Sequence, residues 1–240
     1  MSGAAARVDR QPAFVLHRRN YRETSLLLDL LTRDFGRVGV VARGARGARR
    51  GAGGACQPFQ PLLVSWSGRS ELKTLVSAEA VATAPAIAGE RLYSALYVNE
   101  VLVRVLPQGD AHAQLFHAYA ALLPELAGAA DLEPRLRAFE LLLLRELGYG
   151  LEFDRDCATG GVLEPAGAYL FQAAEGFSAA PADAQDRSYP GWALAEIGRG
   201  DFSRPQTRRY AKRLMREALA QLLGDRPLAS RAYFRARRDV

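Results

Sequence analysis

Between residues 43 and 55 the chain contains only glycine, alanine and arginine. No side chain in this segment is both apolar and large enough to pack onto a core, so we expect an exposed loop. Guanidinium groups on a glycine-rich backbone can fork onto phosphate oxygens of irregular spacing, which favours a nucleic acid as the partner. A solubilising loop without a partner is the alternative. The candidate DNA contacts here are Arg37, Arg43, Arg46, Arg49 and Arg50.

Charge is distributed unevenly along the chain. Residues 1–80 contain 13 Lys and Arg against 6 Asp and Glu, residues 81–200 contain 8 against 16, and residues 201–240 contain 11 against 4. The net charge of +6 therefore combines two basic ends with an acidic middle. This pattern indicates that both ends contact a polyanion while the middle has a different role.

Composition predicts a cytoplasmic protein. No apolar run approaches the ~18 uncharged residues of a membrane span, and the N-terminus lacks the apolar centre of a secretory signal. The two cysteines, Cys56 and Cys157, are far apart in sequence and fit a compartment in which thiols stay reduced.

Short apolar runs separated by turn-forming residues predict a small all-β domain over residues 1–82. The five runs are residues 14–17, 25–31, 38–41, 61–66 and 72–76. Such a pattern suits a small closed barrel of the OB-fold kind, which presents loops and a sheet face to nucleic acids. Phe59 and Trp66 lie in apolar surroundings and are expected in the core, whereas Tyr21 and Phe35 lie in turns, where exposed rings can stack on bases.

The apolar period becomes helical from Gly89, so residues 83–240 are predicted to form a mostly helical domain and the fold class is α+β. We expect three helices to pack together as its core, one ending at Pro107 and two spanning residues 111–126 and 133–147. Residues 151–187 are irregular, with a short hairpin around residues 168–172 and Phe177. Further helices are expected at residues 190–197 and 205–223.

The last of these helices is amphipathic and strongly basic. Its apolar residues share one side of a helical wheel, and five cations lie in an adjoining arc. We therefore expect the helix to dock by its apolar side and to offer its cations to DNA. The cations are Arg208, Arg209, Lys212, Arg213 and Arg216.

Motifs of catalysis are scarce, and no cofactor is expected. The chain has no Gly-x-Ser-x-Gly elbow and no phosphate-binding loop with its lysine and hydroxyl. A cleaving enzyme with two metal ions would need carboxylates such as Glu152, Asp154 and Asp156, but a polar loop edge is the favoured interpretation of that cluster. A DNA-binding structural or transcription-related protein is the second alternative, although no segment reads as a helix-turn-helix.

Several motifs together resemble the RecO family of bacterial recombination mediators. They occur in family order from about residue 12 to residue 234, so the resemblance covers nearly the whole chain. The ordered set is specific, although no single motif is. The motifs are residues 13–17, 23–25, 41–46, 57–59, 72–75, 92–100, 139–141, 147–150 and 227–231.

The resemblance implies an N-terminal OB-fold, a helical C-terminal domain and a cytoplasmic, nucleoid-associated role in DNA repair. Family members bind single- and double-stranded DNA, anneal complementary strands and work with RecR. They act on DNA covered by single-stranded DNA-binding protein so that RecA can load, and they do so without nucleotide hydrolysis.

One departure concerns zinc, which many family members hold with two Cys-x-x-Cys pairs in the irregular region. Here the corresponding residues 157–160 retain only Cys157. One thiol cannot make a tetrahedral zinc site, so we expect no metal, and residues 151–187 should hold together by packing alone.

The resemblance also implies that the helical domain binds the acidic, apolar C-terminal tail of the single-stranded DNA-binding protein. Cations beside leucine-rich surface would suit such a tail. The candidates are Arg135, Arg137 and Arg145, for each of which helix-surface solubility is the alternative role.

Overall fold

The computed structural model describes residues 7–46, 52–129, 131–230 and 232, so the predicted contacts Arg49 and Arg50 lie outside the described residues. Its contacts divide the chain into two compact units, Met1–Ala130 with Arg226–Val240, and Asp131–Asp225. The predicted boundary at residue 82 separates the barrel from the helices, but it does not separate these units. Among the described residues, no helix combines the length and apolarity that a membrane crossing requires.

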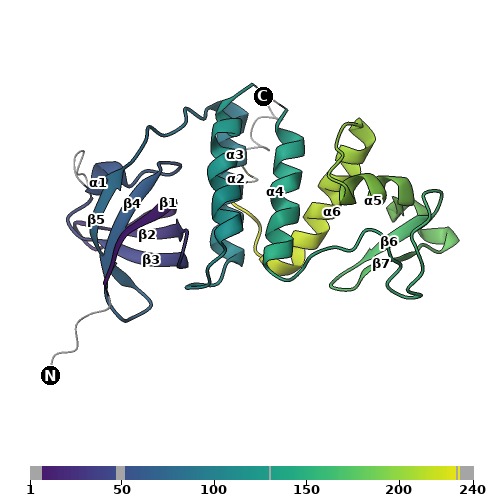
Figure 1. Cartoon of the computed structure of the whole chain (residues 1–240), viewed down its shortest axis with the longest axis horizontal. Helices are drawn as coiled ribbons and strands as arrows, with labels where there is room; N and C mark the ends of the chain where they lie inside the picture. Colours follow the sequence, from purple (N-terminus) through teal and green to yellow (C-terminus); the bar gives the residue numbers. More distant parts are fainter. Residues whose placement is uncertain (1–6, 47–51, 130, 231, 233–240) are drawn as a thin grey trace. The chain divides into compact units, whose positions relative to one another are not determined.

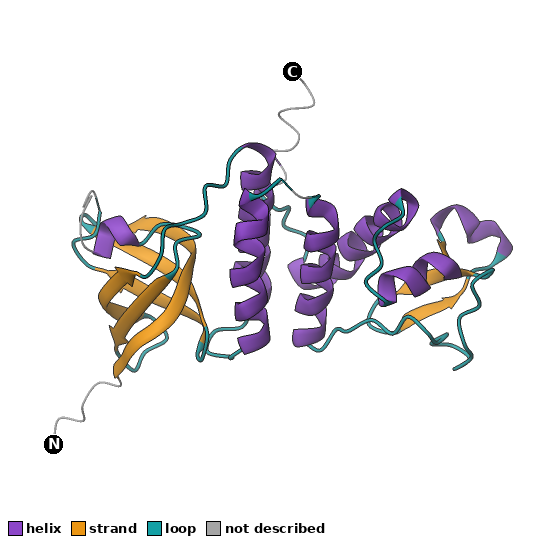
Figure 2. Cartoon of the chain, turned by 45° about the horizontal axis from the view of Figure 1, so that its top comes forward, coloured by secondary structure: helices purple, strands orange, loops and turns teal. Residues whose placement is uncertain are grey.

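The first unit contains the predicted closed barrel, whose strands are ordered β1-β2-β3-β5-β4 (Figures 1 and 2). Its strands are β1 (Arg7–Tyr21), β2 (Ser25–Thr32), β3 (Gly36–Ala42), β4 (Leu62–Ser67) and β5 (Lys73–Ala80). The leucine-rich run at residues 25–31 is strand β2, as predicted. Strand β1 is much longer than predicted because it pairs with both β2 and β4, and two register shifts let it bend around the barrel.

Strand β1 contributes to two cores at once because its side chains alternate. Ala13 and Val15 point into the barrel core, which Trp66 also fills. Phe14 lies on the other face, where its ring centroid is 5.5 Å from that of Phe116 and 5.1 Å from that of Tyr119. The outer face of the barrel is thus apolar at this strand and requires a cover.

Helices α2 (Gly89–Val105) and α3 (Ala113–Ala127) pack on each other, and α2 packs on β1. Asn99 joins these elements: its Nδ2 donates to the Leu16 carbonyl oxygen at 2.9 Å, and its Oδ1 accepts from the Tyr119 hydroxyl at 2.7 Å. We expected α2 and α3 to form one helical core with the next helix, but they belong to the first unit with the barrel, because the apolar outer face of β1 recruits them there.

The second unit is built on α4 (Leu132–Glu146), which packs along α6 (Pro205–Leu223). The predicted hairpin is confirmed, as β6 (Ala168–Gln172) pairs with β7 (Gly176–Ala179). A short strand, β8 (Tyr189–Pro190), completes this sheet, and the 3₁₀ helix η1 (Ala182–Arg187) precedes it. Helix α5 (Gly191–Gly198) then packs on α6, in agreement with the helical signal at residues 190–197.

The Gly/Ala/Arg segment is not wholly a solvent loop. Ala45 is only 6% exposed and belongs to the barrel core, and the Arg46 amide donates to the Thr24 carbonyl oxygen at 2.9 Å. Residues Ala52–Ala55 form the short helix α1, with Ala55 packed against the same core. The expectation that nothing here could pack is therefore wrong, because an alanine methyl group is large enough to close the end of a small barrel.

Asp156 organises the irregular segment between α4 and β6. Its Oδ1 accepts from the backbone amides of Ala158 at 2.8 Å and Thr159 at 3.0 Å, and its Oδ2 accepts from that of Ala179 at 2.9 Å. One carboxylate thus ties the turn after it to the end of β7. These hydrogen bonds, that from Thr159 most of all, lower the pKa of Asp156 below its usual value.

The same segment is where the resemblance would place a zinc ion. Among the described residues, no three His, Cys, Asp or Glu side chains lie close enough together to hold a metal ion. Cys157 is exposed, and both oxygens of the neighbouring Asp156 are occupied by backbone amides. The expectation that packing alone holds the segment is therefore incomplete, since a hydrogen-bonded carboxylate contributes.

We expect Asp156→Asn to lower the thermal midpoint by several degrees at pH 7, because the new Nδ2 would face the amide donor of Ala179. Since the pKa is depressed in the folded state, the contribution of the carboxylate is complete above the unfolded value of about 3.9 and is lost as pH falls further. The deficit should therefore shrink below about pH 4. Thermal unfolding at pH 7 and pH 3 measures this deficit.

The matched control is Asp154→Asn, because the Asp154 side chain is exposed and its backbone carbonyl makes the local hydrogen bond. Equal stability of Asp156→Asn and Asp154→Asn at pH 7 would contradict the role of Asp156. EDTA should leave the midpoint of the parent unchanged.

Candidate nucleic-acid interface

A groove of about 780 Å³ lies at one rim of the barrel. Three parts of the chain line it: the β1–β2 turn, the end of β3, and the β4–β5 connection with the start of β5. The lining residues of this barrel-rim groove are Tyr21, Arg22, Glu23, Thr24, Ser25, Val41, Arg43, Ser70, Leu72, Lys73 and Thr74.

The register of the barrel brings these three segments together. Leu26 at the start of β2 pairs with Ala42 at the end of β3, so the β1–β2 turn lies beside Arg43. Val40 and Val41 of β3 pair in parallel with Lys73 and Thr74 of β5. A parallel pairing places the end of β3 next to the second residue of β5, and this closure builds the rim.

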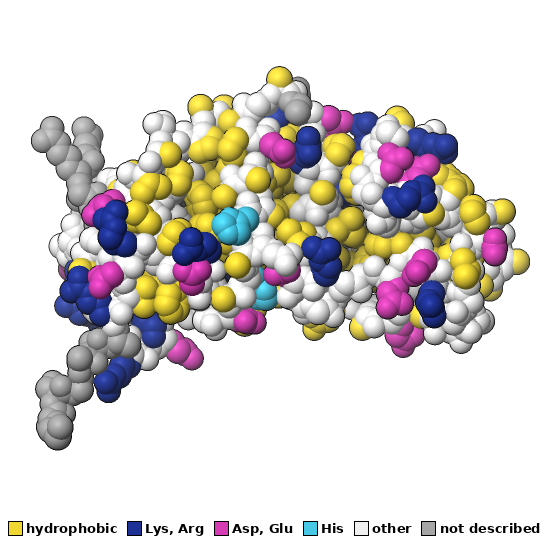
Figure 3. All heavy atoms as spheres, in the orientation of Figure 1, with side chains coloured by type: hydrophobic (Ala, Val, Ile, Leu, Met, Phe, Trp, Pro, Cys, Tyr) yellow, Lys and Arg dark blue, Asp and Glu magenta, His cyan; other side chains and the backbone are white. Residues whose placement is uncertain are grey.

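Three cations and several hydroxyl groups line the groove. Arg22, Arg43 and Lys73 are opposed by a single acidic residue, Glu23, and Thr24, Ser25 and Ser70 add hydroxyl groups. Lysine and arginine bind phosphate oxygens, and hydroxyl groups can donate to the same oxygens. Figure 3 shows Lys and Arg side chains, in dark blue, over the surface that the barrel forms.

Tyr21 gives the groove an aromatic ring. The guanidinium carbon of Arg22 lies 5.2 Å from the centroid of the Tyr21 ring, which is a cation–π contact. Arg22 adopts a positive φ of 53°, as the turn requires. A half-exposed tyrosine beside cations is the combination that stacks bases of a single strand without reading their sequence.

The arginines predicted around the loop have different roles in the structure. Arg43 is exposed and lines the groove. Arg46 is exposed, but its Nη1 donates to the carbonyl oxygens of Arg22 at 3.4 Å and Glu23 at 3.3 Å, so it braces the turn. Unlike Arg46, Arg43 projects from its turn without such a bond to the described residues.

Arg37 is used inside the first unit. Its Nη1 donates to Asp29 Oδ1 at 2.8 Å and its Nε donates to the Leu106 carbonyl oxygen at 2.9 Å. The Arg37 side chain is only 17% exposed. The structure therefore places Arg37 between the barrel and the end of α2, and its predicted DNA contact stays a prediction.

Three of the five cations on α6 are paired within the second unit. Arg208 bonds to Asp131, and Lys212 Nζ lies 3.3 Å from Glu133 Oε1, so both tie α6 to the start of α4. Arg213 stacks on Tyr189 with its guanidinium carbon 3.9 Å from the ring centroid.

The two remaining α6 cations, Arg209 and Arg216, are exposed, and neither has an ion pair among the described residues. Of the five cations predicted to contact DNA, these two could do so without first breaking an interaction within the described chain.

The three arginines predicted to bind an acidic tail do not share one environment. Arg137 is 7% exposed and its Nη2 donates to Glu140 Oε1 at 3.1 Å. Arg135 and Arg145 are exposed on α4. They are ten residues apart on a helix, which corresponds to a rise of about 15 Å.

The four aromatic residues singled out in the sequence also differ in their environments. Phe59 and Trp66 are 8% and 3% exposed, which confirms that they belong to the core. Phe35 is 40% exposed and meets Trp66 edge-on, with ring centroids 5.4 Å apart. Tyr21 lines the groove.

Sequence reasoning did not name Arg22, Ser70 or Lys73 as candidate contacts, although all three line the groove. The signal for Arg22 was present, because an arginine beside an aromatic residue in the first turn of an OB-like barrel lies where such barrels contact nucleic acids. Lys73 gave no signal, since only the closure of β3 onto β5 brings it to the rim.

Comparison with known proteins gives one result over nearly the whole chain. Residues 7–84 match the family described as "Recombination protein O N terminal", and residues 88–232 match "Recombination protein O C terminal".

Similar proteins named "DNA repair protein RecO" cover most of the chain. That of Cellvibrio japonicus is 45% identical over 95% of this chain and 97% of its own length. That of Sodalis glossinidius is 47% identical over 94% of this chain and 86% of its own length. That of Methylococcus capsulatus is 43% identical over 98% and 96%, respectively.

We expect Arg37→Ala to lower the free energy of unfolding by roughly 2 kcal/mol, because it leaves the partly buried Asp29 carboxylate and the Leu106 carbonyl oxygen without their donor. Chemical denaturation measures this loss. Arg43→Ala is the control, since that side chain is exposed, and its stability should match the parent. A stable Arg37→Ala protein with weakened DNA affinity would instead make Arg37 a DNA contact.

Proposed function

The chain belongs to the Recombination protein O family of DNA repair proteins, and from that premise we propose that it binds single- and double-stranded DNA and anneals complementary strands. With RecR, it would help RecA load onto DNA covered by single-stranded DNA-binding protein. The observation that carries the DNA-binding part is the barrel-rim groove, where Arg22, Arg43 and Lys73 converge from three separate segments.

The chemistry of the groove fits the backbone of a nucleic acid strand. The three cations would contact phosphates, and their arrangement along an open groove suits a flexible chain of charges. Tyr21 would stack on a base through a face that every base possesses. No bidentate reader of base edges is needed for such binding, so we expect affinity to depend weakly on sequence.

Annealing follows from electrostatics. Two strands repel each other through their phosphates, and a protein that binds both reduces this repulsion so that bases can pair. The groove supplies one cationic surface, and Arg209 and Arg216 on α6 supply a second that is free of ion pairs within the described residues. Neither surface requires a nucleotide or a metal ion for this work, so we propose a mediator without catalysis.

The protein partners are proposed from family membership. RecR and RecA would act on the same DNA, and the acidic tail of the single-stranded DNA-binding protein would meet exposed arginines of the helical region. Arg135 and Arg145 are exposed on α4 and suit this contact, while Arg137 is committed to Glu140. A sequence-tolerant structural or transcription-related DNA-binding protein is the second candidate, because the groove alone would serve it equally well.

We expect the triple variant Arg22→Ala, Arg43→Ala, Lys73→Ala to bind single-stranded DNA more weakly and with less salt dependence. Losing three phosphate contacts should reduce the slope of log affinity against log salt by about 2. Fluorescence anisotropy of a labelled oligonucleotide between 50 and 300 mM salt measures the slope. Over this range the Debye screening length falls from roughly 14 to 6 Å.

The matched control removes equal charge elsewhere through Arg155→Ala, Arg187→Ala, Arg199→Ala, all exposed residues of the second unit. If both triple variants lose the same slope, binding follows net charge and the groove is not the site.

The annealing step has its own test. We expect the parent to accelerate pairing of complementary oligonucleotides coated with single-stranded DNA-binding protein, and Arg209→Ala with Arg216→Ala to slow this pairing while the affinity for one strand changes little. Stopped-flow fluorescence of strand pairing reports the rate. DNA binding without any acceleration by the parent would favour the structural or transcription-related candidate.

A further inference from the structure

A second pocket lies wholly within the second unit, between the end of α4 and the turn that joins β6 to β7. It has a volume of about 300 Å³. Leu144, Phe171 and Ala218 supply apolar surface from three different elements, α4, β6 and α6. Tyr149, which directly follows the glycine that ends α4, lines the pocket and is 46% exposed, one of the few large apolar side chains in the described chain with that much exposure.

Two carboxylates also line this pocket. Glu152 comes from the segment after α4 and Glu175 from the β6–β7 turn. Both residues are exposed, and neither side chain has a hydrogen bond or an ion pair within the described part of the chain. The pocket is therefore lined by two carboxylates that have no partner within the described part of the chain.

The end of α4 adds a third source of negative potential. The Tyr149 amide donates to the Leu144 carbonyl oxygen at 2.8 Å, and the Gly148 amide donates to that of Arg145 at 3.1 Å, with Gly148 at a φ of +81°. This is a Schellman-type end, so the carboxyl terminus of a 15-residue helix adjoins the pocket. Helix carboxyl termini favour cations.

We propose that this pocket binds a basic side chain, with an apolar neighbour, from a partner protein. The methylene stem of an arginine or lysine would lie on Leu144 and Phe171, and its charged head would reach Glu152 and Glu175. The exposed Tyr149 ring adds a face for a cation–π contact. Peptides with one anchoring side chain are commonly recognised by a pocket that has an apolar floor and a charged rim.

The charge of the rim decides between kinds of partner. Phosphates of DNA would be repelled by Glu152 and Glu175, and so would an acidic peptide tail. The stem of Arg145, in the last turn of α4, lies beside Gly150 of the pocket, but the charged side chains that line the pocket are Glu152 and Glu175. The pocket therefore favours a basic segment of a protein partner. It shares no lining residue with the barrel-rim groove.

The test titrates the full chain with a capped, fluorescein-labelled peptide, Ala-Arg-Phe-Arg-Ala, and with its acidic counterpart, Ala-Glu-Phe-Glu-Ala. We expect the basic peptide to bind saturably and to shift the amide signals of Tyr149 and Glu175 in nuclear magnetic resonance spectra, whereas the acidic peptide should leave these two signals unshifted. Glu152→Lys with Glu175→Lys should weaken this binding at least tenfold, and Tyr149→Ala should weaken it severalfold. Single-stranded DNA affinity should not fall in these variants.

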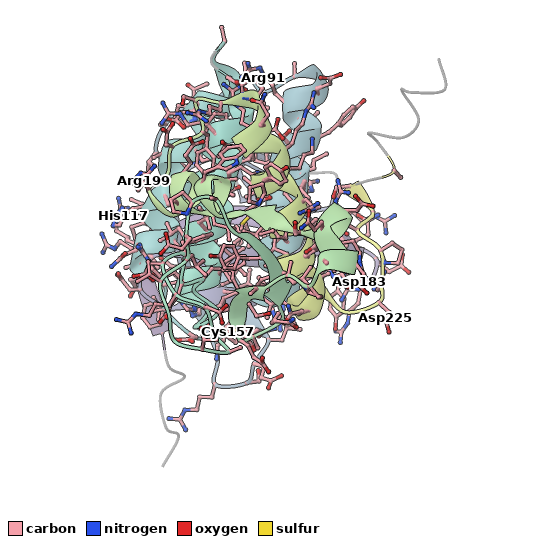
Figure 4. The ribbon with its side chains drawn as sticks, turned by 90° about the vertical axis from the view of Figure 1, so that its right-hand side faces the viewer. Arg91, His117, Cys157, Asp183, Arg199 and Asp225 are labelled. Atoms are coloured by element: carbon pink, nitrogen blue, oxygen red, sulfur yellow. The ribbon has the colours of Figure 1, made fainter. Side chains whose placement is uncertain are left out.

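The matched control is Asp183→Lys with Asp225→Lys, which reverses two carboxylates of the same unit. Figure 4 labels both on a different side of the unit from Cys157, whose Cβ lies close to Gly176 of the pocket. This control should retain peptide affinity. No saturable binding of the basic peptide, shifts of the Tyr149 and Glu175 amides by the acidic peptide, or equal losses in both charge-reversed variants would overturn the proposal.

Since Glu152, Glu175 and Tyr149 are exposed, all the variants should fold, and their thermal midpoints verify this. Loss of DNA binding by the groove variants would leave the peptide result unaffected, so the two sites can fail independently.

Discussion

The first unit depends on a buried hydrogen-bond relay through Asn99. The Leu16 carbonyl oxygen lies on the outer face of a barrel strand, and Asn99 and Tyr119 lie on the two helices that cover it. Asn99 is 2% exposed and Tyr119 is fully buried, so each polar group would be costly without its partner. Burial also raises the pKa of Tyr119 and keeps its hydroxyl a donor at all ordinary pH. Apolar contact alone would allow α2 and α3 to slide on the barrel, whereas this relay specifies one register.

The arginines of this protein have two roles, and their contacts within the chain distinguish them. Arg37, Arg208 and Arg213 reach carbonyl oxygens, carboxylates or aromatic faces of their own unit, so they hold elements together. Arg43, Arg209 and Arg216 are exposed and have no ion pair among the described residues, so their charge remains for a polyanion. Net charge therefore overestimates the binding surface of such a protein. A guanidinium that is already paired contributes to folding and adds little to the attraction of phosphates.

One carboxylate, that of Asp156, organises the irregular segment between α4 and β6. The sequence showed that Cys157 has no partner thiols, and this was enough to exclude tetrahedral zinc. It did not show that Asp156 would bind three backbone amides and connect the turn to β7. A carboxylate next to a loop is ordinary in any sequence, and its role depends on an amide 23 residues away. Glu100 acts in a similar way in the first unit, where its carboxylate accepts from the amides of Ala229 and Ser230.

The sequence by itself determined most of the elements, because hydrophobic period and turn residues are local. The five barrel strands, the longer helices, the hairpin and the burial of Phe59 and Trp66 could be predicted, whereas α1, η1, β8 and the full length of β1 could not. The ordered motifs also indicated the family. Only the tertiary structure decided which helices cover the barrel, which cations are free, and that Lys73 meets Arg43 at one rim. These properties arise from contacts between residues far apart in the chain, and pairing partners such as Asp29 or Asp131 leave no mark in the sequence around the arginine they bind.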